Sequence, residues 1–197
     1  MTPFGRSTSL SQSETTILDA CVVINLHACR RIAEIIGTIP GPVVLADRVF
    51  QECRFDPFST SDNDGERAER MDLRELIASE RLGLIDDVSD DELRTYVDLA
   101  IDLDDGEAMT LALAIHRGYT VVTDDRAAIR MLGARAPLRS TLDLVREWAE
   151  REAITPDVVR ATLTDLRGRG RYVPGRNHPL RAWWDQFMSD LYQPLNA

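Results

Sequence analysis

The chain has 197 residues, of which 44% are hydrophobic, and a formal net charge of −10 at pH 7. This length suits one domain with a sizeable core, or one domain with a small appendage. The negative charge argues against a general nucleic-acid coat protein, which would be basic, but not against a nuclease that gathers carboxylates around metal ions.

Two further features of the composition narrow the chemistry. All 23 basic residues are arginine, which excludes a Schiff-base or P-loop lysine but keeps a side chain well suited to phosphate. The three cysteines, Cys21, Cys29 and Cys53, form no CxxC pair and have no histidine at zinc-finger spacing. We therefore predict free thiols, with neither a disulfide framework nor a zinc site.

The sequence favours a cytoplasmic protein. No apolar run approaches the ~20 residues that span a bilayer, so we expect no membrane partner. The Ser/Thr-rich residues 1–14 lack the apolar stretch of a signal peptide, and we expect a flexible leader there.

In the first half of the chain, hydrophobic spacing predicts alternating strands and helices. A β-prone run over 15–18 is followed by a helix over 21–36, which Gly37 stops. A buried strand is predicted over 43–46, and Asp47 is a suitable N-cap for a short helix that carries Glu52.

The same alternation continues to about residue 139, after which the pattern is helical. We predict, in chain order, a loop over 55–65, a helix over 66–79, a strand over 82–85, helices over 90–103 and 105–117, a strand over 119–123, a short helix from Asp124, a strand over 134–138, and helices over 140–152, 155–168 and 179–192. This order predicts an α/β layered fold with a mostly parallel sheet over 15–150, and a helical, arginine-rich C-terminal extension over 151–197.

Acidic residues follow three of the predicted strands. Asp19 comes directly after the first strand, Glu52 lies shortly after the second, and Asp124 and Asp125 follow the strand over 119–123. In an open parallel sheet, ligands bind at the carboxyl ends of the strands, so these side chains should converge. Glu107, near the start of the helix before that strand, is a candidate for the same site.

Such a group of carboxylates predicts a metal site. Carboxylates that lie close together repel one another and raise each other's pKa, and a divalent cation removes the conflict. Oxygen ligands without cysteine or histidine favour Mg²⁺ or Mn²⁺ over zinc. These ions can bind a scissile phosphate and activate water.

Each acid also has a purely structural explanation when it is taken alone. Asp19 could be an N-cap, Glu52 a solvated helix residue, and Glu107 a residue that favours the positive end of a helix. Asp124 could cap the helix that follows, which would leave Asp125 as the ligand. The metal-site interpretation rests on their occurring together, in order, each at the end of an element.

Four segments resemble the motifs of PIN-domain nucleases, in particular the toxins of type II toxin–antitoxin pairs (VapC-like) and their relatives. They are Ile17-Leu18-Asp19-Ala20-Cys21-Val22-Val23-Ile24-Asn25-Leu26, Ala46-Asp47-Arg48-Val49-Phe50-Gln51-Glu52, Gly106-Glu107-Ala108-Met109-Thr110-Leu111-Ala112-Leu113-Ala114 and Val121-Val122-Thr123-Asp124-Asp125. The resemblance covers about residues 15–150. It departs from the family at Ala20-Cys21, where many relatives carry small hydroxyl or amide residues.

The resemblance implies a PIN-like three-layer fold and a metal-dependent endoribonuclease with one or two Mg²⁺ or Mn²⁺ ions. Carried over by motif, the catalytic residues and metal ligands are Asp19, Glu52, Glu107 and Asp125, with Asp124 as an auxiliary ligand and Thr123 hydrogen-bonded near the site. The partners that it implies are an RNA substrate, an antitoxin protein and a second copy of the chain in a homodimer.

Two other functions remain open. One is a catalytically inactive PIN-fold interaction module, although such a module has no reason to keep four mutually repelling carboxylates. The other is a metal-dependent DNA nuclease or phosphodiesterase; a flap nuclease among these would need extra helical features to thread DNA.

The extension also allows two interpretations. Its arginines and aromatic residues could guide RNA, since arginine binds phosphates and aromatic rings stack on unpaired bases. Alternatively, the helical spacing of Trp183, Trp184, Phe187 and Leu191 predicts the apolar face of a terminal helix that docks on the body or on a partner.

Overall fold

A computed structural model describes residues 15–53 and 73–189 of the chain. Its centre is a five-stranded sheet in the order β3-β2-β1-β4-β5, and every pairing in it is parallel. The strands are β1 (Thr16–Leu18), β2 (Val43–Ala46), β3 (Gly83–Ile85), β4 (Thr120–Val122) and β5 (Leu138–Arg139). The predicted α/β fold with a parallel sheet is confirmed.

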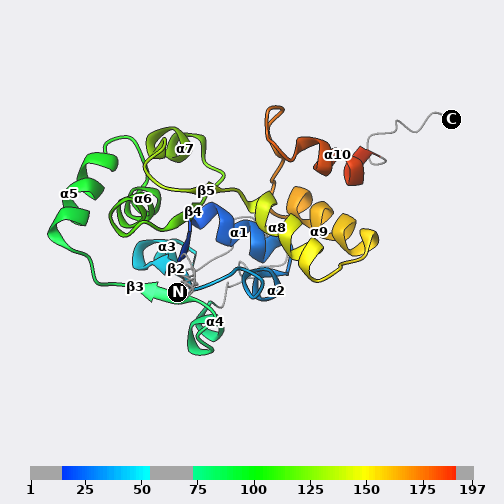
Figure 1. Ribbon diagram of the computed structural model, residues 1–197, viewed down its shortest axis with the longest axis horizontal. Coiled ribbons are helices and arrows are strands. Elements are labelled where there is room, and N and C mark those ends of the chain that lie inside the picture. The colour runs from blue at the N-terminus through cyan, green and yellow to red at the C-terminus, as the bar shows by residue number, and fades with distance from the viewer. Residues whose placement is uncertain (1–14, 54–72, 190–197) are drawn as a thin grey trace, which may run out of the picture.

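Helices cover both faces of this sheet, which gives the three layers (Figure 1). They are α1 (Ala20–Ala28), α2 (Ile32–Ile36), α3 (Asp47–Glu52), α4 (Arg74–Ala78), α5 (Asp90–Leu99), α6 (Asp105–Arg117), α7 (Arg126–Leu132), α8 (Thr141–Arg151), α9 (Pro156–Gly168) and α10 (Arg181–Met188). In Figure 1, α5, α6 and α7 lie on one side of the strands, and α1, α2, α8 and α9 lie on the other.

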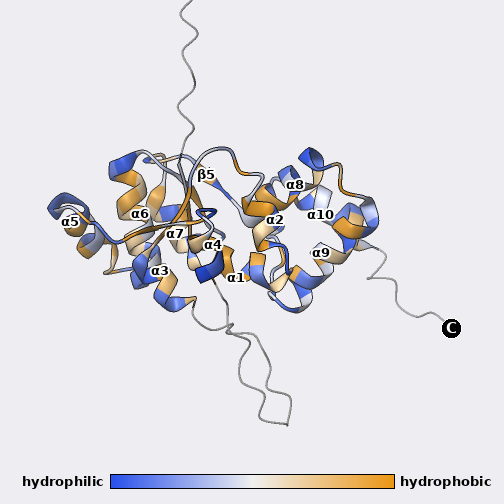
Figure 2. Cartoon of the chain, turned by 90° about the horizontal axis from the view of Figure 1, so that it is seen from below, coloured by the Kyte–Doolittle hydropathy of each residue, from blue (hydrophilic) through white to orange (hydrophobic). Residues whose placement is uncertain are grey.

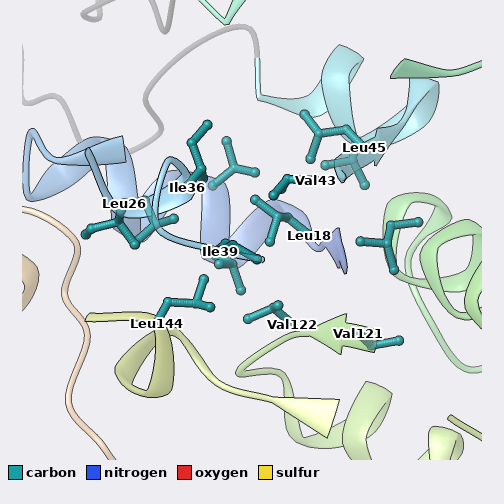
Figure 3. Close-up of a cluster of buried hydrophobic side chains, with 14 of the residues drawn as sticks. Leu18, Leu26, Ile36, Ile39, Val43, Leu45, Val121, Val122 and Leu144 are labelled. Atoms are coloured by element: carbon teal, nitrogen blue, oxygen red, sulfur yellow. The ribbon is translucent and has the colours of Figure 1, made fainter. Parts of the chain in front are cut away.

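The two central strands are buried on both faces, as parallel strands between helical layers usually are. Ile17 and Leu18 of β1, and Val121 and Val122 of β4, are fully buried. Figure 3 shows apolar side chains from α1, β2 and α8 gathered around these strands, and in Figure 2 the helices turn apolar residues inward and polar residues outward. This rigid centre holds the ends of β1 and β4, where the acidic residues lie.

Several elements differ in extent from the prediction. The helix expected over 21–36 is two helices, because Arg30 adopts a left-handed conformation (φ 58°) and its N–H bonds to the His27 carbonyl at 2.8 Å. The helix expected over 90–103 ends at Leu99, and the last strand is limited to Leu138–Arg139. Of the helix expected over 66–79, α4 lies within the described residues. The leader over 1–14 and the loop over 55–65 lie outside them.

The helices after residue 150 share the core of the sheet. Leu163 and Leu166 of α9 and Trp184 and Met188 of α10 are fully buried in the same hydrophobic cluster as β1 and β4. This confirms for Trp184 the predicted docking on the body, while Leu191 lies outside the described residues. In the described part of the chain, none of the helices is long and apolar enough to cross a membrane.

An ion pair joins the start of α5 to the end of α6. Arg117 donates to Glu92 Oε1 at 2.6 Å and to Glu92 Oε2 at 3.1 Å, and Glu92 also completes a capping box with Ser89. Glu92 is 3% exposed. Hydrogen bonding from Arg117 lowers its pKa to about 2, from an ordinary value of 4.5.

This ion pair predicts a pH-dependent stability. A carboxylate with a lowered pKa stabilises the fold above its unfolded pKa, and that contribution is lost as the pH falls from about 4.5 toward 2. We expect Glu92→Gln to lower the free energy of unfolding by about 1–3 kcal/mol at pH 7. The difference from wild type should shrink toward zero near pH 2, as measured by urea unfolding. Asp91→Asn, which breaks an exposed pair, is the matched control and should cost less than about 1 kcal/mol.

Candidate active site

The site lies where the strand order reverses beside β1. β1 and β4 are neighbours in the sheet, although a hundred residues separate them in the chain, and Leu18 pairs with Val122. The N–H of Asp19 extends this pairing by donating to the Val122 carbonyl at 3.1 Å. The carboxyl ends of these strands therefore lie side by side, at the position where α/β sheets commonly bind ligands.

A single hydroxyl connects the two strand ends. Thr123 Oγ1 donates to Asp19 Oδ2 at 2.6 Å and accepts from the N–H of Asp125 at 3.1 Å. Thr123 and Asp19 are both fully buried. The hydrogen bond expected from Thr123 near the site is thus present, and it fixes the first acid relative to the last.

Asp19 and Asp125 also cap the helices that follow them. Asp19 Oδ1 accepts from the N–H of Ala20 at 2.8 Å, and Asp125 Oδ1 accepts from the N–H groups of Ala127 and Ala128. Asp19 therefore has the capping role that it could have alone, and Asp125 has a capping role that the sequence analysis gave to Asp124. Capping orients their carboxylates at the edge of the sheet and so does not exclude a role in the site.

Glu52 reaches the start of α6 through a contact that requires glycine. Its Oε1 accepts from the N–H of Gly106 at 2.9 Å. A Cβ at position 106 would lie 2.5 Å from Glu52 Oε2, so any larger residue would displace the carboxylate. This contact is a physical reason for the glycine that precedes Glu107.

Burial and, to a smaller extent, the charges of the other acids raise the pKa values of three of the four acids. Burial, followed by the charges of Asp19 and Asp125, raises the pKa of Glu107 to about 7. Burial also raises the pKa of Asp19 and of Glu52, and the Asp19 charge contributes to the shift of Glu52. The four predicted acids thus influence one another, although they come from four separate segments.

Asp124 differs from the prediction in both its structural role and its surroundings. The side chain that caps α7 is Asp125, one residue later than the expected cap. Asp124 accepts from Asn25 Nδ2 at 3.2 Å, and from both the backbone N–H and the hydroxyl of Thr141 at the start of α8. Burial raises its pKa, and the three donors oppose that rise.

Four residues around these acids were missed by the sequence analysis. Cys21 donates to Asp19 Oδ2 at 3.2 Å and accepts from the N–H of Asp124 at 3.4 Å. Asn25 and Thr141 bind Asp124, and burial followed by the Asp124 charge raises the pKa of the Tyr172 hydroxyl. Of these four, Asn25 alone could have been noticed in the sequence, because it is a polar residue within an otherwise apolar helical segment.

The donor chemistry of the site fits Mg²⁺ or Mn²⁺, because all four predicted ligands are carboxylates. In the part of the chain that the structure describes, no three acidic, histidine or cysteine side chains are arranged to hold an ion together as they stand. As they stand, Asp19, Glu52 and Asp125 each turn an oxygen to a backbone N–H.

Comparison with known families agrees with the fold. Residues 15–178 match the PIN domain. The chain belongs to the PIN-domain family. No curated protein is significantly similar to the chain. PIN domains are typically nucleases and generally use divalent ions such as Mg²⁺. The matched region of this PIN domain includes α9 and ends within the segment that precedes α10.

The contacts of Asp124 and Asp125 predict different effects of removing each charge. Asp124→Asn should lower the free energy of unfolding by about 1–3 kcal/mol, because an amide N–H replaces one of the two oxygens that accept from Asn25 on α1 and Thr141 on α8. Asp125→Asn should change the free energy of unfolding by less, because asparagine caps a helix about as well as aspartate, but it should weaken Mn²⁺ binding more. Urea unfolding and Mn²⁺ titration measure the two effects. If Asp124→Asn weakens Mn²⁺ binding as much as Asp125→Asn does, Asp124 is itself a ligand.

Glu107 predicts a second pH dependence, of opposite sign to that of Glu92. A carboxyl group whose folded pKa is raised from 4.5 to about 7 destabilises the metal-free fold increasingly as the pH rises through that range. We expect Glu107→Gln, in EDTA, to raise the melting temperature at pH 8 by about 2–4 °C, the effect of ~1 kcal/mol in a chain of this length. The gain should vanish at pH 4.5. An equal rise in melting temperature at both pH values would show that the charge of Glu107 is not its cause. The control is Glu75→Gln, a change at an exposed residue, and we expect no such pH-dependent rise from it.

Proposed function

We propose that this PIN domain is a Mg²⁺- or Mn²⁺-dependent endoribonuclease that uses Asp19, Glu52, Glu107 and Asp125. The observation that supports the proposal is that Asp19 and Asp125 follow the paired strands β1 and β4, and that burial, followed by the charges of these two acids, raises the pKa of Glu107. A binding module would gain nothing from this destabilising arrangement. Family resemblance, rather than a contact in the structure, favours RNA over DNA.

The four carboxylates would hold one or two ions, which supply positive charge for the scissile phosphate and for the leaving oxygen. Thr123 fixes Asp19 and also binds the backbone of Asp125. Asp125 is fixed at the start of α7 and Glu52 at the start of α6. Glu107 would be a further ligand to the ions or would orient the attacking water.

A protein partner is supported by the surface of α5 and the turn after it. Leu93, Val97 and Ile101 follow one another at a spacing of four residues and are 41%, 61% and 79% exposed. An exposed apolar stripe of this kind is typical of an interaction surface. It is consistent with the toxin role, in which an antitoxin protein or a second copy of the chain would cover it.

The test is cleavage of a labelled RNA panel with Mg²⁺ or Mn²⁺, and with EDTA, beside an equal panel of single-stranded DNA. We expect cleavage of RNA that requires metal and that falls by about 100-fold or more in Asp19→Asn and Asp125→Asn. Asp91→Asn, an exposed change on α5, is the control and should cut like wild type. Cleavage of DNA alone would establish the alternative nuclease. Failure to cut either substrate while binding no metal would favour the inactive interaction module.

A further inference from the structure

A pocket of about 510 Å³ opens beside Glu52, and no step of the proposed reaction uses it. It lies between α3, the segment after β3, α5 and the start of α6. Its volume is within the range of sites that bind small molecules. Because Glu52 belongs both to this pocket and to the acidic site, whatever occupies the pocket lies next to the reacting phosphate.

Apolar side chains form much of the pocket lining. Ile85 and Met109 are buried, Val88 is half-buried and Leu93 is exposed. The apolar lining thus includes both buried and exposed side chains. A phosphate or a sugar would gain little from such a surface. The flat face of an aromatic ring would gain the free energy of removing its own surface and that of the lining from water.

Arg48 adds a fixed planar group to one wall. Its guanidinium carbon lies 4.7 Å from the centre of the Tyr96 ring, and its Nη1 donates to Asp105 Oδ2 at 3.1 Å. The Tyr96 hydroxyl donates to the other oxygen of Asp105 at 2.9 Å. These contacts hold the guanidinium in one orientation, and the plane of an arginine is a surface on which unpaired RNA bases stack.

The remaining polar groups at the pocket favour hydrogen-bond donors on the occupant. The carboxylates of Asp47 and Asp86 line it, and Asp47 Oδ1 accepts from Gln51 Nε2 at 3.4 Å. Acidic side chains repel phosphate, so the polar edge of a base is the better match. Guanine alone among the four bases places two neighbouring donors, N1–H and the N2 amino group, where one carboxylate can accept both.

We propose that this pocket is a base-binding subsite that receives an unpaired guanine adjacent to the scissile phosphate. That the neighbouring phosphate is the one cleaved rests on the proposed ribonuclease function, whereas binding of the base does not depend on cleavage. Asp47 and Asp86 are the groups that select guanine, Arg48 provides the stacking plane, and the apolar lining removes the ring from water. Cleavage should therefore occur beside guanine.

Binding is tested first, with free nucleosides and EDTA, so that no cleavage intervenes. Guanosine should bind the wild-type chain at least about 10-fold more tightly than adenosine, cytidine or uridine, as judged by NMR titration. In Asp47→Asn/Asp86→Asn, which keeps the shape of the pocket, the preference should fall to within about threefold. Asp91→Asn should bind like wild type. A melting curve for each variant shows that it is folded.

Mapping of cleavage positions separates this inference from the proposed function. With a random-sequence RNA and Mn²⁺, guanine should be enriched about 10-fold or more at one position flanking the cut, and the double variant should lose that enrichment. RNA cleavage without base preference, together with equal binding of the four nucleosides, would overturn the subsite but leave the nuclease. Selective binding of guanosine without any cleavage of RNA would instead leave the subsite and overturn the proposed function.

Discussion

The hydrogen bonds of one buried hydroxyl hold the candidate site together. Thr123 Oγ1 donates to Asp19 and accepts from the backbone of Asp125, so it links the ends of two strands that are distant in the sequence. A hydroxyl is well suited to this place because it can donate and accept at once. A valine of similar shape could do neither, and the buried Asp19 carboxylate would lose its shortest contact.

Around this link, the protein accumulates negative charge that the fold does not neutralise. The Asp19 carboxylate is fully buried and is surrounded by donors that are neutral, namely a hydroxyl, a thiol and a backbone N–H. Elsewhere a buried acid is paired with arginine, as Glu92 is with Arg117, and its pKa falls. The pKa is lowered at Glu92, which has an arginine partner, and is raised by burial at Asp19, Glu52 and Glu107. A cation bound beside these three acids would stabilise their charged forms, as Arg117 stabilises that of Glu92.

The sequence predicted those parts of the site that depend on local pattern. Asp19 and Asp125 follow the ends of predicted strands, and Glu52 lies on a short helix after another strand. In a parallel sheet, these positions fall at the same edge. The break after α1 could not be predicted, because Arg30 takes a left-handed conformation that its side chain does not favour. The role of Asp124 was also beyond local reasoning, because its partners, Asn25 and Thr141, come from helices that tertiary packing alone brings together.

The contacts of Asp124 also explain why the helices after residue 140 belong with the site. Asp124 is bound by the first residue of α8, while α9 and α10 contribute Leu166 and Trp184 to the hydrophobic core. Arg169, just after α9, donates to the carbonyl of Ala28 at the end of α1, and Gly170 lies so close to Asn25 that a Cβ there would be 3.0 Å from its amide oxygen. The segment after α9 is therefore packed against the helix whose asparagine holds Asp124. If that packing were lost, Asn25 and its hydrogen-bond partner Asp124 would lose support, and with them the β4–α7 turn that carries Asp125. The C-terminal helices therefore support the geometry of the acids, although they supply none of them.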